Sequence, residues 1–151
     1  MAIVISAFAY AMARAAGLEL TPNGEILSQG EVLFRLEQKL DEKISDDTYF
    51  AFIDWIRAFH KDEPNLVFTY ANEIRDEDIG ALALAAKSAM NLRDALVRIE
   101  RYFRLVTDTA VYRLDEDQSP AMFRFEARTR DRAALQLRDE CALAALTNKI
   151  R

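Results

Sequence analysis

The chain has few of the residues that form disulfides, bind metal ions or make tight turns. Cysteine occurs once, at Cys141, so no disulfide can form within the chain, and a single thiol fits a reducing cytoplasm. Histidine also occurs once, at His60, and zinc sites need three or four N, S or O ligands, so no metal site is expected. Four glycines and three prolines in 151 residues argue against an all-β protein rich in tight turns.

Basic charge and long apolar runs are also scarce. The net charge is −5 and the pI is near 5.0, so the chain as a whole lacks the basic face that nucleic acids require. A DNA-binding role would need another domain. Residues 1–16 are apolar, but no basic segment precedes them and Arg14 interrupts them, so we interpret them as an ordinary helix. With no run of 18 uncharged apolar residues elsewhere, we expect no membrane span and a cytoplasmic location.

What remains is the composition of an ordinary globular domain. Hydrophobic residues make up 51% and charged residues 30% of the chain, with helix formers such as Ala, Leu, Arg and Glu prominent. We expect one domain over 1–151. Its predicted fold class is α+β: mostly helical, with a small antiparallel hairpin or sheet in the C-terminal third.

Helical spacing of apolar residues, together with capping signals, predicts most of the elements. The expected helices cover 3–16, 31–43, a stretch from an Asp46 or Asp47 cap to about His60, one from Glu63–Pro64 through Ile74, 81–90, one from an Asn91 cap towards Val106, and a last helix from about Arg132 with Asp131 as cap. The last helix meets no Gly or Pro at its end, so we expect further protein after Arg151.

The apolar period changes from 3.6 to 2 after the helix that begins at Asn91. Alternation over 111–114 and 122–126, with the polar connector 115–120 between them, predicts a β-hairpin. An isolated hairpin is marginal in water, so it must pack on helices or pair with another strand.

No catalytic constellation can be assembled, so no enzyme is expected. Paired acidic residues fall at predicted helix starts, where capping and the helix dipole explain them, and there is no phosphate loop or nucleophile elbow. The aromatic residues instead suggest a core that can also wall a small-ligand pocket. Candidate ligand-binding residues are the polar-tipped Tyr70 and Tyr102 together with Arg101.

Three further features have structural interpretations beside functional ones. His60 sits at a predicted helix end, where a cation is favourable, and the alternative is that it binds a ligand or haem. Cys141 fits a small buried hydrophobe better than a reactive thiol. The arginines of 124–138 form a basic cluster, interpreted as a solvated face, with an acidic partner, an anionic effector or DNA phosphates as alternatives.

The order of several motifs resembles the N-terminal effector domain of AraC-type transcription regulators. The motifs are Asp78-Ile79-Gly80, Leu92-Arg93-Asp94-Ala95-Leu96, Arg101-Tyr102-Phe103-Arg104-Leu105 and the two strands, with similar elements at Ala15–Leu18, Asp41–Ser45 and Leu135–Ile150. The likeness spans nearly the whole chain, although 17–41 is hard to align.

This resemblance implies a cytoplasmic bacterial regulator whose N-terminal domain binds a small-molecule effector, forms a homodimer and reaches DNA only through an attached helix-turn-helix domain. It implies no cofactor, no membrane and no particular effector. Two other functions stay open from the residues alone: a ligand-free oligomerisation module that uses the last helix, and a small haem- or lipid-binding sensor.

Overall fold

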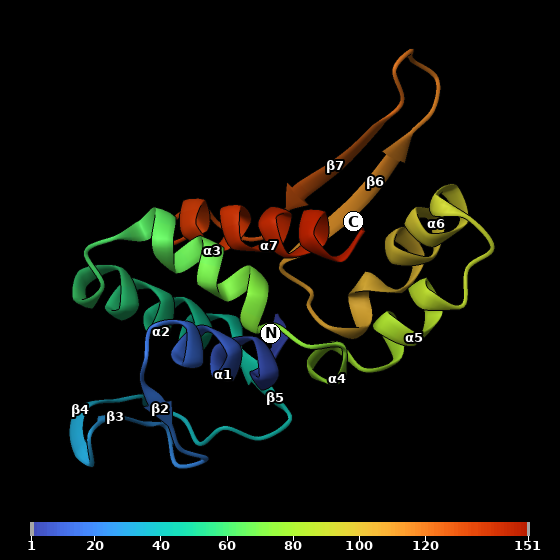
Figure 1. Ribbon diagram of the computed structural model, residues 1–151. Coiled ribbons are helices and arrows are strands. Elements are labelled where there is room, and N and C mark those ends of the chain that lie inside the picture. Colours follow the sequence, from blue (N-terminus) through green and yellow to red (C-terminus); the bar gives the residue numbers. More distant parts are fainter. Residues whose placement is uncertain (1, 151) are drawn as a thin grey trace.

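The computed structural model describes residues 2–150 and confirms a mostly helical α+β fold (Figure 1). The helical elements are α1 (Ser6–Ala15), α2 (Asp46–Phe59), α3 (Glu63–Glu73), α4 (Asp76–Ile79), α5 (Ala81–Lys87), α6 (Leu92–Tyr102), the 3-10 turn η1 (Phe103–Leu105) and α7 (Leu135–Lys149). The strands are β1 (Ile3–Ile5), β2 (Glu19–Leu20), β3 (Glu25–Ser28), β4 (Glu31–Arg35), β5 (Lys43–Ser45), β6 (Ala110–Asp115) and β7 (Met122–Ala127). They pair antiparallel as β1-β5, β2-β3-β4 and β6-β7.

Side-chain caps mark the starts of α2, α3 and α6. Asn91 was expected to cap α6, and its Oδ1 accepts the N–H of Asp94 at 2.8 Å. For α2 the expected cap was wrong by one residue. The Oγ of Ser45, and not a carboxylate of Asp46 or Asp47, accepts the N–H of Thr48 at 3.2 Å. Both acidic residues lie in the first turn, where the helix dipole favours negative charge.

The predicted hairpin is confirmed, because β6 and β7 pair in register from Ala110 with Ala127 to Asp115 with Met122. It projects from the body of the molecule next to α6 (Figure 1). Helix α6 is shorter than expected. It ends at Tyr102 and tightens into η1, so Val106 lies beyond it.

Three other expected helices are wrong in whole or in part. The segment 31–43 is strand β4 followed by irregular chain, because Gln29 and Gly30 both have positive φ (50° and 82°) and form a two-residue turn that pairs β4 with β3. Residues 3–5 form β1, which pairs with β5, instead of the start of α1. The last helix begins at Leu135, and no side chain caps it at Ala134.

Buried side chains form two hydrophobic clusters. The first draws most of its side chains from α1, α2, α3 and one face of α7, and it includes the fully buried Phe50, Phe52 and Ile53. The second is smaller and lies between α5, α6 and the hairpin, around Ile99 and Tyr112. Phe8 packs against both clusters.

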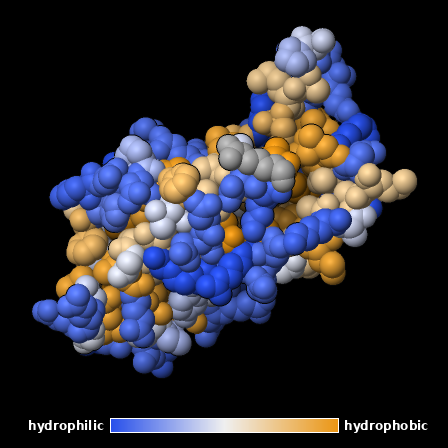
Figure 2. Space-filling view, in the orientation of Figure 1, coloured by the Kyte–Doolittle hydropathy of each residue, from blue (hydrophilic) through white to orange (hydrophobic). Residues whose placement is uncertain are grey.

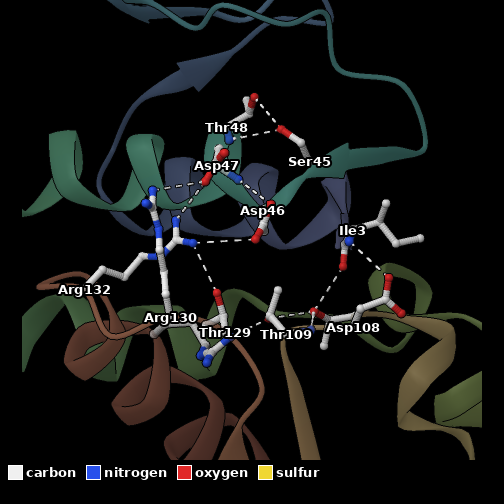
Figure 3. A network of polar contacts seen from close by, with 12 residues as sticks. Ile3, Ser45, Asp46, Asp47, Thr48, Asp108, Thr109, Thr129, Arg130 and Arg132 are labelled. Atoms are coloured by element: carbon white, nitrogen blue, oxygen red, sulfur yellow. Dashed lines mark hydrogen bonds and ion pairs between the residues drawn. The ribbon is translucent and has the colours of Figure 1, made fainter. Parts of the chain in front are cut away.

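Strand β1 connects the two halves through its backbone. The N–H of Ile5 donates to the carbonyl of Val106 at 2.9 Å, and the N–H of Asp108 donates to the carbonyl of Ile3 at 3.0 Å. A second connection runs along the surface, where Arg130 and Arg132 contact Asp46 and Asp47 at the first turn of α2 (Figure 3). The expected solvated face of arginines is therefore partly an ion-pair network.

Candidate ligand-binding cavity

A cavity of ≈ 470 Å³ lies where the two hydrophobic clusters meet. All the helices from α1 to α7 and both hairpin strands contribute to its wall. Its volume falls in the range of about 300–1,000 Å³ that is usual for small-ligand sites. In the space-filling view, apolar side chains gather around the base of the hairpin and over the neighbouring α5 and α6 (Figure 2).

Most of the cavity wall is apolar or aromatic. Phe8, Leu82, Ile99, Phe103 and Phe125 are among the residues that supply it. The aromatic residues are held by one another. Phe103 meets Tyr112 edge-on at 4.8 Å between ring centroids, and Tyr112 stacks on Phe123 at 4.8 Å. Aromatic pairs in these arrangements attract each other beyond the burial of their surface.

A few buried polar side chains face the cavity. They are Tyr49, Tyr70, Thr107, Thr109, Tyr112, Arg138 and Cys141. Burial raises the pKa of all three tyrosines above its ordinary value, so each phenol stays neutral and keeps its O–H. Burial also raises the pKa of the Cys141 thiol to about 12, which fits the expected unreactive small hydrophobe.

Among these seven buried residues, Arg138 is the one whose side chain carries a charge, and 6% of its surface is exposed. Its Nε–H donates to the Asp139 carboxylate at 2.7 Å, and its Nη1 donates to the Thr109 hydroxyl at 2.7 Å. The Nη2 atom is buried and has no hydrogen-bond partner. The guanidinium also lies over two rings, 5.3 Å from the centroid of Phe50 and 5.2 Å from that of Phe125.

Charged side chains cluster at the rim of the cavity. The Asp76 carboxylate pairs with Lys149 at 3.0 Å and with Lys87, and Lys149 also donates to the carbonyl of Ile74 at 3.1 Å. Hydrogen bonds from Lys87 and Lys149 lower the pKa of Asp76. All three side chains are partly exposed, so this cluster joins α4, α5 and α7 at the edge of the cavity.

The three ligand-binding candidates predicted from the sequence do not lie in one site. Tyr70 lines the cavity and is 5% exposed. Arg101 and Tyr102 line a second, more open groove between α5 and α6 instead. Arg101 follows the cavity-lining Ile99 by two residues, which is about 200° around a helix, so it faces away from the cavity.

Sequence reasoning missed Arg138 because it counted this residue with an exposed basic cluster. A signal was available. Ala134, Arg138, Cys141 and Ala145 recur at spacings of three and four, so Arg138 falls on the apolar face of α7. An arginine on a buried helix face is unusual and often marks a binding site.

His60 lies apart from the cavity. It follows α2, and its backbone N–H donates to the carbonyl of Ile56 at 2.7 Å, which is the expected helix-end position. It does not contribute to the cavity wall. Within residues 2–150, no group of three or more His, Cys, Asp or Glu side chains is placed to hold a metal ion. Over the same residues, no helix combines the length and apolarity needed to cross a membrane.

An apolar cavity with a few buried polar groups defines the class: this is the layout of a small-molecule-binding domain. The protein-family model described as the arabinose-binding domain of AraC transcription regulator, N-terminal, matches residues 26–151. The chain belongs to this family, as the motif order indicated, and is an N-terminal ligand-binding domain of an AraC-type regulator. The family is one of regulatory ligand-binding domains and not of enzymes. No curated protein matches the chain.

Proposed function

We propose that this domain senses a small-molecule effector in the cavity between its two clusters and transmits binding to an attached helix-turn-helix domain that reads DNA. The regulator would act in the cytoplasm, and residues 1–151 would form its sensing unit. The observation that carries this proposal is the ≈ 470 Å³ cavity whose apolar wall includes the buried Arg138.

The position of the cavity suggests how binding would be transmitted. A ligand inside it contacts the first cluster through Tyr49 and Tyr70 and the second through Ile99 and Phe125. It would therefore favour one arrangement of the two halves over others, which is a population shift. Helix α7 lines the cavity from Arg138 to Lys149, so a change in its position would reach any domain attached after it.

Homodimerisation is the second part of the proposal. Apolar side chains remain exposed on α5, α6 and η1, namely Leu84, Leu92 and Leu105. The last helix, which the sequence suggested as the interface, exposes Leu143, while its Leu135 and Leu146 pack against the clusters. Exposed apolar side chains that lie close together are typical of protein interfaces. Sedimentation equilibrium of the domain would give the oligomeric state, and a monomer at all concentrations would contradict this part.

A thermal-shift screen tests the sensing function. The purified domain is heated with amino acids, sugars, aromatic acids, fatty acids, amines and nucleotides. A ligand at 100 times its dissociation constant stabilises the fold by about 2.7 kcal/mol, which raises the Tm of a 150-residue domain by roughly 5–11 °C. A reproducible shift from one chemical class supports effector sensing. No shift from any class, with a stable dimer, would leave the ligand-free oligomerisation module as the function.

A further inference from the structure

The unpaired donors of Arg138 point to the chemistry of the ligand. A guanidinium has five N–H donors and stays charged at any pH a protein survives. In Arg138 one donor serves Asp139 and one serves Thr109, both at 2.7 Å. Both N–H groups of the buried Nη2 lack an acceptor. Leaving a buried charged donor unpaired is costly, and because Arg138 lines the cavity, an acceptor on a ligand there would remove this cost.

The surroundings of Arg138 favour an anionic acceptor over a neutral one. Four charged residues line the cavity, and three of them, Lys87, Arg138 and Lys149, are basic. The remaining one, Asp76, is already paired with both lysines at the rim. The partner of Arg138, Asp139, is partly exposed to solvent, which screens its charge. A ligand carboxylate would therefore enter a cavity with excess positive charge, where Arg can bind it through two parallel hydrogen bonds.

The rest of the cavity wall determines what kind of ligand body would bind favourably. Beyond Arg138 most of the cavity wall consists of aliphatic and aromatic side chains, and the tyrosine hydroxyls of Tyr49, Tyr70 and Tyr112 are spread among them. The hydroxyls of Thr107 and Thr109 are 2.8 Å apart and satisfy each other. A polyhydroxylated ligand would leave most of its hydroxyls against this apolar wall, which costs free energy. An alkyl or aryl chain would bury its surface there at a gain.

We propose that the effector is an organic carboxylate with an apolar body, whose carboxylate pairs with the Nη2 side of Arg138 while its chain lies among Ile99, Phe103 and Phe125. This assignment rests on the proposed sensing function, and it deepens that function by naming the ligand class.

Matched pairs of probes test it on the wild-type domain. Decanoate is compared with decan-1-ol, and 4-phenylbutyrate with 4-phenylbutan-1-ol, by calorimetric titration at pH 7.5. Each pair shares its apolar chain and differs in the group that would meet Arg138. We expect at least one acid to bind about 10- to 100-fold more tightly than its alcohol, the usual range for a hydrogen bond to a charged group. An alcohol that binds as well as its acid would overturn the assignment, and so would two acids that do not bind.

Two substitutions test whether Arg138 causes the tighter binding of the acids. Arg138→Met keeps an unbranched apolar stem but removes the guanidinium and its charge, and it should reduce the acid-to-alcohol ratio to about 1–3. Arg132→Met is the matched control. Arg132 lies over the same Phe50 ring, at 4.4 Å, and also has a buried unpaired nitrogen, but it does not line the cavity. It should leave the ratio unchanged. A ratio that persists in Arg138→Met would assign the carboxylate to another cation and refute the role of Arg138.

A second variant covers the case in which Arg138→Met fails to fold. Arg138→Lys keeps the charge but loses the planar pair of donors, so it should retain acid binding with an affinity reduced about tenfold. Lysine binding as tightly as arginine would contradict the two-bond geometry. The thermal-shift screen distinguishes an error in the ligand class from an error in the proposed sensing function. If sugars or amines stabilise the domain and carboxylates do not, the ligand class is wrong and sensing stands. If no class stabilises it, sensing itself fails.

Discussion

Filling the cavity with a side chain gives a direct test of its existence. Ala83 lies on α5, is 7% exposed and lines the cavity. The Ala83→Leu substitution adds three carbon atoms at a position where Ala and Leu have similar helix propensities, so packing decides the result. At about 0.8 kcal/mol per buried methylene, complete burial in empty space would add at most about 2.4 kcal/mol to the free energy of unfolding. Allowing for imperfect fit, we predict a gain of about 1–2 kcal/mol.

Thermal unfolding followed by circular dichroism measures this effect. For a domain of this size, each kcal/mol changes the Tm by about 2–4 °C, so the Tm should rise by roughly 2–8 °C. The same substitution should reduce the thermal shift caused by a ligand of the cavity, because the leucine takes part of the space that the ligand would fill. Stabilisation together with a weaker ligand response is a combination that a surface effect would not produce.

Ala13→Leu is the control for this experiment. Ala13 is buried in α1, within the first cluster, and does not line the cavity. Extra carbons there meet close-packed neighbours, so overpacking should cost about 1–3 kcal/mol. If Ala83→Leu destabilises the domain as much as Ala13→Leu does, the space beside α5 is filled in solution and the reasoning about the cavity is refuted.

Three further predictions concern a cap, a thiol and the rim. Ser45→Ala should cost about 0.5–2 kcal/mol in urea denaturation, and Asp47→Ala should cost less; equal losses would contradict the assignment of the α2 cap. In the folded protein the pKa of the Cys141 thiol is raised to about 12, against 9.0 ordinarily. The unfolded chain therefore loses this proton first, so the free energy of unfolding should be unaffected below pH 9 and should fall above it by up to about 1.4 kcal/mol per pH unit. Cys141→Ala should weaken this fall between pH 9 and 10, where an unchanged slope would argue against the buried thiol. Asp76→Ala should speed ligand association and dissociation in stopped-flow experiments, since it removes the ion pairs that join α5 and α7, and unchanged rates would show that the rim does not control entry.

The predictions that succeeded rest on signals local in sequence. Asn91 caps α6 because its side chain reaches an N–H three residues away, and the hairpin is visible because two segments alternate on either side of a polar turn. Helix α3 begins beside Pro64, in the first turn, where proline costs no hydrogen bond. In each case the atoms that stabilise the element are neighbours in the chain.

The wrong predictions have a common physical cause, which is long-range pairing. Residues 3–5 leave the expected helix because β1 finds a partner in β5, forty residues on, and in the segment before β6. The 31–43 segment has helical spacing, but the positive φ angles at Gln29 and Gly30 turn it back onto β3. Tertiary pairing of this kind outweighs the small free energies of helix propensity.

The sequence by itself determined the fold class, the helices α2, α3, α5 and α6, the hairpin and the order of motifs that marks the family, because each depends on near neighbours or on composition. Only the tertiary structure decided where the cavity lies and which side chains reach it. It brought Tyr70 into the wall, left Arg101 outside and buried Arg138. The reason is that a cavity is made by elements distant in the chain, and the burial of one charge depends on the helices packed around it.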